Sequence, residues 1–121
     1  MSTSAASGDQ RIAALRDLVE MRIPVVESIE ALSRFDWDSD DELVILVSGD
    51  ALRVLNGYLS GTLSREEVEQ WADALEVRDD VGREPEFEEE LGELLFQLAT
   101  PDVAGELVPD LAKEWIEKLR R

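Results

Sequence analysis

The 121-residue chain contains no cysteine and no histidine. The absence of cysteine excludes disulfide bonds, thiolate nucleophiles and cysteine metal sites. The absence of histidine removes the side chain that most often acts as a general base and as a transition-metal ligand. A glycine-rich phosphate loop and a nucleophile elbow are also missing. We therefore expect that the protein is not an enzyme and that it has no catalytic residue, metal site or cofactor.

Long apolar segments are missing as well. The longest apolar run, "LVILV" at residues 43–47, is far too short to cross a bilayer. The N-terminal "MSTSAASGDQ" has neither the basic start nor the apolar stretch of a signal peptide. These features predict a cytoplasmic protein that is not anchored in a membrane.

Positive charge is scarce, because 12 Lys and Arg residues stand against 29 Asp and Glu residues, for a net charge of −17. Such a chain repels nucleic acid and anionic membranes. We therefore expect its partner to be a basic protein. The hydrophobic content of 44% is nevertheless high enough for a folded core.

Apolar residues recur at helical spacing along most of the chain, starting with Ile12, Leu15 and Val19. This pattern predicts an all-α fold, a bundle of five or six short helices built from helical hairpins. We expect residues 1–9 to form a disordered tail and residues 10–121 to form a single helical domain.

Helix boundaries are marked by proline and serine. Pro24, Pro85 and Pro109 are placed to open helices. Ser48 is a candidate N-cap, and Ser64 forms a predicted capping box with Glu67. Between these helices, residues 43–47 fit either a short extended segment or a buried turn, and "RDDVGREP" at residues 78–85 is predicted to be a loop.

One internal repeat is visible at an offset of 44 residues. "GTLSREEVEQWADAL" from Gly61 and "GELVPDLAKEWIEKL" from Gly105 share glycine, leucine, tryptophan and leucine at matching positions. In a helical hairpin, the glycine adopts the left-handed turn after one helix and the tryptophan faces inward from the next. We interpret the repeat as two hairpins built in the same way.

The acidic segment "FDWDSDDELVIL" begins like a calcium loop, with Asp36, Asp38 and Asp40 at the first, third and fifth positions. The sixth position, however, is Asp41 in place of the glycine that makes the turn. The twelfth position is Val47 in place of the glutamate that closes the coordination sphere. We therefore expect a solvated acidic loop and no calcium site.

Acidic residues also form two stripes at helical spacing, and these are the predicted partner-binding residues: Glu69, Asp73, Glu76 and Asp80 on one helix, and Glu86, Glu90 and Glu93, continued by Gln97, on the next. Like charges at this spacing cost about 0.2–0.5 kcal/mol per pair. An acidic face kept at that cost indicates a basic partner that neutralises it. A solvated coat that only aids solubility is the alternative.

The adjacent Arg78, Asp79 and Asp80 combine one basic and two acidic groups at a predicted helix end. Local ion pairs are common at such positions. We expect these residues to form a salt bridge to another helix.

Glu89, Glu90 and Glu93 match one magnesium-binding motif of the all-α nucleoside triphosphate pyrophosphohydrolases. Spacings of three and four residues place carboxylates on one helix face, where they hold a metal that bridges a triphosphate. The second motif of those enzymes occurs only upstream, from Glu76 to Asp79, so the order is reversed. A charged outer helix face is the simpler interpretation.

"LRVLNGYLSGTLSREEVEQWADALEVRDDVG", residues 52–82, resembles an uncharacterised family of small acidic helical bacterial proteins with Tyr-Leu-x-Gly-x-Leu-Ser before a Glu-rich helix. "FDWDSDDELVIL" and "GELVPDLAKEWIEKL" fit the same pattern, apart from Val108, which stands where a capping Ser or Thr is expected. The helix–Gly-x-Leu-Ser–helix core also resembles the self-protective, colicin D-type immunity proteins. That resemblance implies an acidic protein that covers the active cleft of a basic ribonuclease toxin, although no residue corresponds one to one.

The sequence therefore favours a non-catalytic protein-binding module, an immunity-like inhibitor that neutralises a basic nuclease toxin through its acidic helix faces. Two alternatives stay open. One is a magnesium-dependent nucleotide pyrophosphohydrolase. The other is a helical adaptor or assembly protein, for which we expect an exposed apolar groove and binding that barely changes with salt. The pattern does not determine the oligomeric state.

Overall fold

The computed structural model describes residues 3–35 and 41–120, with side chains from Gln10 onward. These residues are mainly α-helical, so the predicted fold class is confirmed. Asp36, Asp38 and Asp40 of the predicted acidic loop lie outside the described residues. In chain order the elements are α1 (Thr3–Glu20), α2 (Val25–Leu32), β1 (Val44–Leu46), α3 (Ser48–Ser60), α4 (Arg65–Glu76), β2 (Val81–Arg83), the 3₁₀ turn η1 (Pro85–Phe87), α5 (Glu88–Ala99), α6 (Pro101–Ala104) and α7 (Pro109–Leu119).

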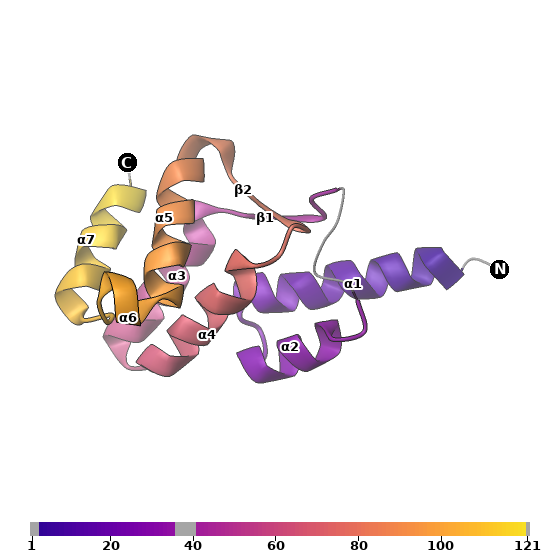
Figure 1. Ribbon diagram of the computed structural model, residues 1–121, viewed down its shortest axis with the longest axis horizontal. Helices are drawn as coiled ribbons and strands as arrows, with labels where there is room; N and C mark the ends of the chain where they lie inside the picture. Colours follow the sequence, from indigo (N-terminus) through magenta and orange to yellow (C-terminus); the bar gives the residue numbers. More distant parts are fainter. Residues whose placement is uncertain (1–2, 36–40, 121) are drawn as a thin grey trace.

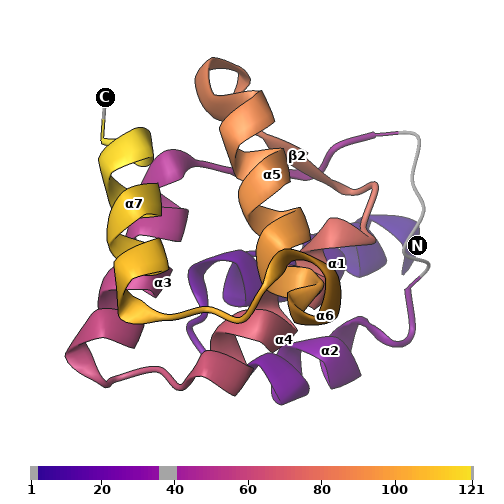
Figure 2. The same cartoon turned by 60° about the vertical axis from the view of Figure 1, so that its left-hand side comes forward.

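Pairs of helices build the bundle (Figure 1). Helix α1 lies beside α2, α4 packs along α5, and α3 packs against α7. The first pair is a hairpin of consecutive helices, whereas α3 and α7 come from distant parts of the sequence. In both views α5 stands between α7 and the α1–α2 pair (Figure 2).

Trp71 of α4 is the largest fully buried side chain among the described residues. Its indole N–H donates a hydrogen bond to the backbone carbonyl oxygen of Val19, near the end of α1, at 3.2 Å. A buried N–H without a partner costs about 1–3 kcal/mol. The hydrogen bond therefore lets a large amphipathic ring fill the core while it holds α4 against α1.

The 44-residue repeat corresponds in part to a structural repeat. The predicted left-handed turn is present at Gly61, with φ 84° and ψ 2°, whereas Gly105 has a positive φ of 99° with an extended ψ of 149°. Both positive φ angles favour glycine because a Cβ strains this backbone conformation. In each copy the tryptophan and the following leucine are buried, as predicted, at Trp71, Leu75, Trp115 and Leu119. The indole N–H of Trp115 donates to the side-chain oxygen of Gln97 on α5 at 2.9 Å.

The capping box predicted for α4 is confirmed. The Glu67 backbone N–H donates to the Ser64 hydroxyl at 3.1 Å, and the Ser64 backbone N–H donates to the Glu67 carboxylate at 2.9 Å. Ser48, by contrast, is the first residue of α3 and not its N-cap. Its backbone N–H donates to the carboxylate of Glu84 at 2.8 Å, a partner far along the chain.

Helix α1 begins at Thr3, inside the segment that was predicted to be a tail, while residues 1–2 lie outside the described part. No proline interrupts this segment, and extending an existing helix costs far less than starting one. At its other end, the backbone N–H groups of Met21 and Arg22 donate to the carbonyl oxygens of Leu18 and Asp17. With Met21 at a φ of 51°, these bonds form a Schellman turn into α2.

The sequence did not predict the two-stranded parallel sheet. Strand β1 pairs with β2, with Val44 opposite Val81 and Leu46 opposite Arg83. Parallel strands need a long crossover connection, which α3 and α4 supply here. Of the two interpretations of residues 43–47, the extended segment is therefore confirmed. The predicted loop at residues 78–85 contains a strand.

The left-handed turn at Gly61 predicts opposite effects of alanine at two glycines. We expect Gly61→Ala to lower the free energy of unfolding by about 1–2 kcal/mol, because a Cβ is strained at this φ although the space around it is open. Gly49→Ala, inside α3, is the matched control, because a Cβ added at Gly49 would lie 4.0 Å from the Val47 side chain, an ordinary van der Waals contact. It is expected to leave stability unchanged or raise it by about 0.4–1 kcal/mol. Urea denaturation checks both values, and equal effects would contradict the backbone explanation.

Candidate functional site

Asp80 is fully buried and forms an ion cluster with two arginines. Its carboxylate accepts hydrogen bonds from Nε and Nη2 of Arg78, both at 2.9 Å, and from Nε of Arg11 on α1 at 3.0 Å. Its backbone carbonyl oxygen accepts from the N–H of Leu43 at 2.7 Å. Asp80 therefore joins α1, the chain after α4 and the segment that enters β1. The expected salt bridge between this helix end and another helix is present.

The pKa of the Asp80 carboxyl results from opposing effects. Burial alone raises the pKa, because desolvation disfavours the charged form. The hydrogen bonds and charges of Arg78 and Arg11 outweigh burial, so the pKa lies below its ordinary value of 3.8. Asp80 is therefore charged at neutral pH, and it stabilises the fold through both arginines.

Two adjoining polar hollows lie where the end of α4, strand β2 and the start of α5 meet. Their volumes are about 200 and 490 Å³, and Arg83 and Glu88 line both of them. The carboxylates that line the hollows are all exposed, and we name them the acidic surface: Glu42, Glu76, Asp79, Glu88, Glu89 and Glu93. Arg83 is exposed between these acids, whereas Arg78 is held by Asp80.

The first predicted stripe is split by the structure. Glu76 belongs to the acidic surface, but Glu69 lies 3.7 Å from Nε of Arg65, and Asp73 lines a different hollow between α2 and α4. The prediction that Asp80 shares this face is wrong. Helix α4 ends at Glu76, so its helical stepping does not continue to Asp80, which turns inward.

The second stripe is also split by the structure. Glu93 belongs to the acidic surface, whereas Glu90 is half-buried, Glu86 lies in η1, and neither lines the two polar hollows. Gln97, one turn beyond Glu93, bonds to Trp115, so this side of α5 faces α7. The Asp73 side of α4 faces α2 instead. The two stripes therefore do not combine into one face.

The sequence did not predict that Glu42, Asp79 and Glu88 lie around the same hollow. The parallel register that places Val44 opposite Val81 also brings together the chain just before each strand, where Glu42 and Asp79 lie. The acids themselves were visible in the sequence. Their proximity depends on a pairing of two three-residue strands, which leaves no periodic signal of its own.

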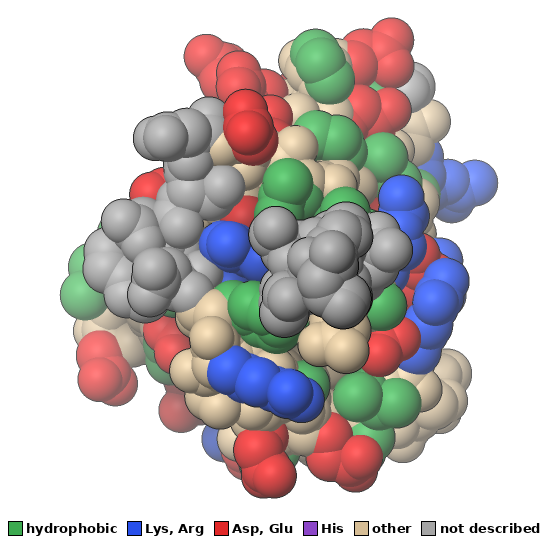
Figure 3. All heavy atoms as spheres, turned by 90° about the vertical axis from the view of Figure 1, so that its right-hand side faces the viewer, with side chains coloured by type: hydrophobic (Ala, Val, Ile, Leu, Met, Phe, Trp, Pro, Cys, Tyr) green, Lys and Arg blue, Asp and Glu red, His purple; other side chains and the backbone are tan. Residues whose placement is uncertain are grey.

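Basic side chains are not confined to one region. Figure 3 shows a face on which acidic, basic and apolar side chains are all present, with acidic ones at its upper and lower edges. On this face, acidic side chains therefore do not form a uniform coat. This uneven distribution makes the local gathering of carboxylates at the acidic surface more informative than the net charge.

The arrangement required by the nucleotide-hydrolase alternative is not found in the described residues. Glu89 and Glu93 line a hollow together with Arg83, but Glu90 is half-buried and does not line it. Within the part of the chain that the structure describes, no group of three or more acidic side chains is placed to hold a metal ion.

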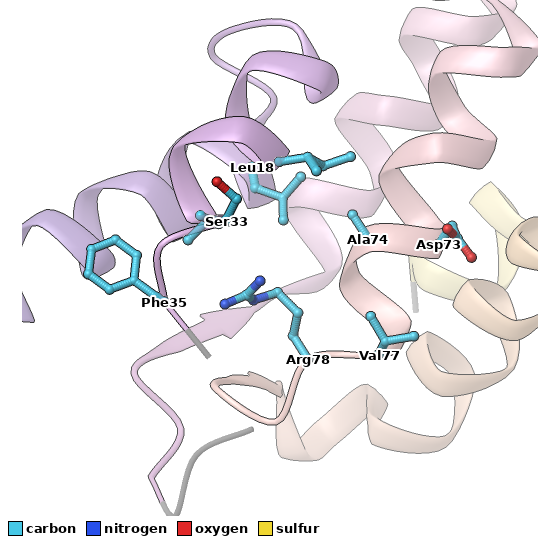
Figure 4. Close-up of a pocket in the computed structure, with 9 residues that line it drawn as sticks. Leu18, Ser33, Phe35, Asp73, Ala74, Val77 and Arg78 are labelled. Atoms are coloured by element: carbon cyan, nitrogen blue, oxygen red, sulfur yellow. The ribbon is translucent and has the colours of Figure 1, made fainter. Parts of the chain in front are cut away.

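A third hollow, of about 360 Å³, lies between α2 and α4 (Figure 4). Asp73, Ser33 and Arg78 are its polar residues, and Arg78 also lines the acidic surface. In Figure 4 the side chain of Arg78 lies between those of Phe35 and Val77. The remaining lining is apolar: Leu18, Ile29, Leu32, Phe35, Ala74 and Val77. This hollow is the kind of feature that the helical-adaptor alternative predicts.

Comparisons of the chain with protein-family models, curated proteins and solved structures found no match. The resemblance to colicin D-type immunity proteins therefore stays a prediction from the sequence. Among the described residues, none of the helices has the length and apolar character needed to pass through a membrane.

The ion cluster predicts a pH-dependent loss of stability in Asp80→Asn. At pH 7 we expect the free energy of unfolding to fall by about 3 kcal/mol or more, because two arginines lose their buried partner. The folded carboxyl has the lower pKa, so its contribution is complete above the ordinary value of 3.8 and is lost as pH falls through the folded-state pKa. Denaturation of both proteins from neutral to acidic pH should show the difference shrinking.

Asp79→Asn is the matched control, since this neighbouring carboxylate is exposed. Its effect on stability should stay within about 0.5 kcal/mol. A difference between Asp80→Asn and the unmodified protein that stays constant down to pH values well below 3.8 would contradict the assignment.

Proposed function

We propose that the protein is a non-catalytic, cytoplasmic protein-binding module that binds a basic protein through the acidic surface. The supporting observation is the meeting of exposed carboxylates from three separate segments: Glu42 before β1, Glu76 and Asp79 at the end of α4, and Glu88, Glu89 and Glu93 on α5. Arg83 is the exposed cation between them.

Electrostatics favour a positively charged occupant for this surface. Two like charges about 4 Å apart repel by about 1 kcal/mol even in water. A basic partner removes that repulsion, and the field of the whole acidic protein speeds its approach. The acids of the first turn of α5 also interact favourably with the helix dipole, so Glu88 and Glu89 are partly compensated without a partner.

The backbone that carries this surface is linked to distant parts of the fold. Asp79 lies next to the buried Asp80, whose carboxylate is bound to Arg78 and Arg11. Strand pairing then sets the position of Glu42 relative to Asp79. A preformed surface binds more tightly than a flexible one, because less conformational entropy is lost on binding.

A nuclease is the partner class that the immunity-protein resemblance implies, and the chemistry is consistent with it. Nucleases and other nucleic-acid-binding proteins contact the phosphate backbone with Lys and Arg. A group of exposed carboxylates likewise presents negative charge to such Lys and Arg side chains. We therefore propose that the acidic surface occupies such a basic cleft and blocks access of nucleic acid to it.

The test compares two double variants that each lose two negative charges. Glu76→Gln with Glu93→Gln changes the acidic surface, and Glu114→Gln with Glu117→Gln changes exposed residues of α7. Tagged proteins capture partners from the source cells at low salt, and a salt gradient elutes them. The first variant should bind the basic partner about three- to tenfold more weakly, since exposed ion pairs contribute up to about 1 kcal/mol each. The α7 variant should bind almost as well as the unmodified protein.

Inhibition of nuclease activity of the captured protein is the second measurement. We expect the unmodified protein and the α7 variant to inhibit, and the acidic-surface variant to inhibit less. Equal loss of binding in both variants would show that only net charge matters. Capture of no basic protein would leave solubility as the role of the acids and would overturn the proposal.

The apolar hollow between α2 and α4 favours a helical adaptor as a second candidate. Docking of an uncharged helix there would persist at high salt, because hydrophobic burial is not screened by ions. The same salt gradient therefore separates the two functions.

A further inference from the structure

The apolar hollow is bordered by hydrophobic side chains that the described fold leaves uncovered. Val77 at the end of α4 is 57% exposed and Ile29 of α2 is 45% exposed. Val26, one turn before Ile29 on α2, is 59% exposed and extends the same helix face. Single exposed apolar residues are ordinary, whereas apolar residues around a hollow mark a binding site.

Acidic side chains lie along the α4 side of this hollow. Asp73, which lines it, is exposed. Arg78 connects it to the acidic surface, where Glu76 and Asp79 lie beside it, and the positive charge of Arg78 is engaged by Asp80. On the α2 side, Ser33 leads into a polar hollow lined by Glu27, Glu30 and the exposed Arg34. On the α4 side, the charges that adjoin the hollow and are not engaged by Asp80 are therefore the carboxylates of Asp73, Glu76 and Asp79.

We propose that this hollow and the adjoining acids form a docking site for an amphipathic basic segment of the partner. A bulky apolar side chain of the segment fills the hollow against Leu18, Leu32 and Val77. Lysine or arginine side chains of the same segment pair with Asp73, Glu76 and Asp79. The inference rests on the proposed function, because it specifies which part of a basic protein is recognised.

Charge complementarity selects this occupant over the others. A second copy of this chain carries the same net charge of −17 and would bring carboxylates toward carboxylates. An uncharged helix would fill the hollow but leave Asp73 and Glu76 unneutralised. An apolar anchor inside a ring of polar contacts is also how binding energy is usually concentrated in an interface.

Two synthetic peptides of leucine and lysine with the same composition serve as probes. In one, the leucines fall on a single helix face, as in peptides that dock in helix-binding grooves. In the other, the order is scrambled so that no apolar face forms. Fluorescence anisotropy measures the affinity of each for the full chain at about 0.05 M and about 0.5 M NaCl. We expect the amphipathic peptide to bind at least about tenfold more tightly and to retain more of its affinity at high salt.

Variants of the hollow separate its role from that of the acids. Val77→Ser with Ile29→Ser removes exposed apolar groups at its border and should weaken the amphipathic peptide about tenfold without changing the scrambled one. Val103→Ser with Val108→Ser changes exposed valines away from the hollow and is the matched control. Circular dichroism confirms that all variants stay folded.

Equal affinity of the two peptides, or equal effects of the two double variants, would overturn the inference. If both peptides bind equally and their binding falls strongly with salt, the apolar hollow is not the docking site. The acidic surface would then remain as an electrostatic binding site. The proposed function itself is decided separately, by capture of a basic protein and its dependence on Glu76 and Glu93.

Discussion

The buried contact of Asp80 with Arg78 and Arg11 is the interaction on which the rest of the arrangement depends. It connects the start of the chain to its middle, and the Asp80 backbone accepts the hydrogen bond from Leu43 that leads into β1. Buried ion pairs contribute little net stability when compared with apolar packing, because desolvation offsets their attraction. What this contact supplies is a link between distant segments. The Asp80 carboxylate bonds to Arg11 of α1, and its backbone accepts the hydrogen bond from Leu43, next to the register that pairs Val44 with Val81.

This position of Asp80 determines where the acids around it can lie. With Asp80 turned inward, Asp79 turns outward beside Glu76, and the paired strands bring Glu42 to the same place. The stripes that follow α4 and α5 in sequence are divided, since one side of α4 faces α2 and the corresponding side of α5 faces α7. The acidic surface combines residues from three separate segments that share no common period, and Glu69, Glu86 and Glu90 fall elsewhere.

Arg78 has a second structural consequence. Its side chain lines both the acidic surface and the apolar hollow, so the two features are parts of one continuous region around the end of α4. Because Asp80 engages its charge, Arg78 does not offset the neighbouring carboxylates as a free arginine would. An apolar depression and a negative border therefore meet where the Asp80 cluster links the end of α4 to α1, an arrangement that suits recognition of a segment that is both basic and apolar.

The sequence by itself determined the features that depend on neighbours within a few residues. Helix periodicity, the Ser64–Glu67 capping box, the helix starts at prolines and the repeated glycines with positive φ all follow from contacts within about one helical turn. Only the tertiary structure decided the burial of Asp80, the cap that Glu84 provides for α3, the β1–β2 pair and the meeting of Glu42 with Asp79. Each of these joins residues far apart in the chain. Short strands and single ion pairs carry too few residues to leave a pattern that local reasoning detects.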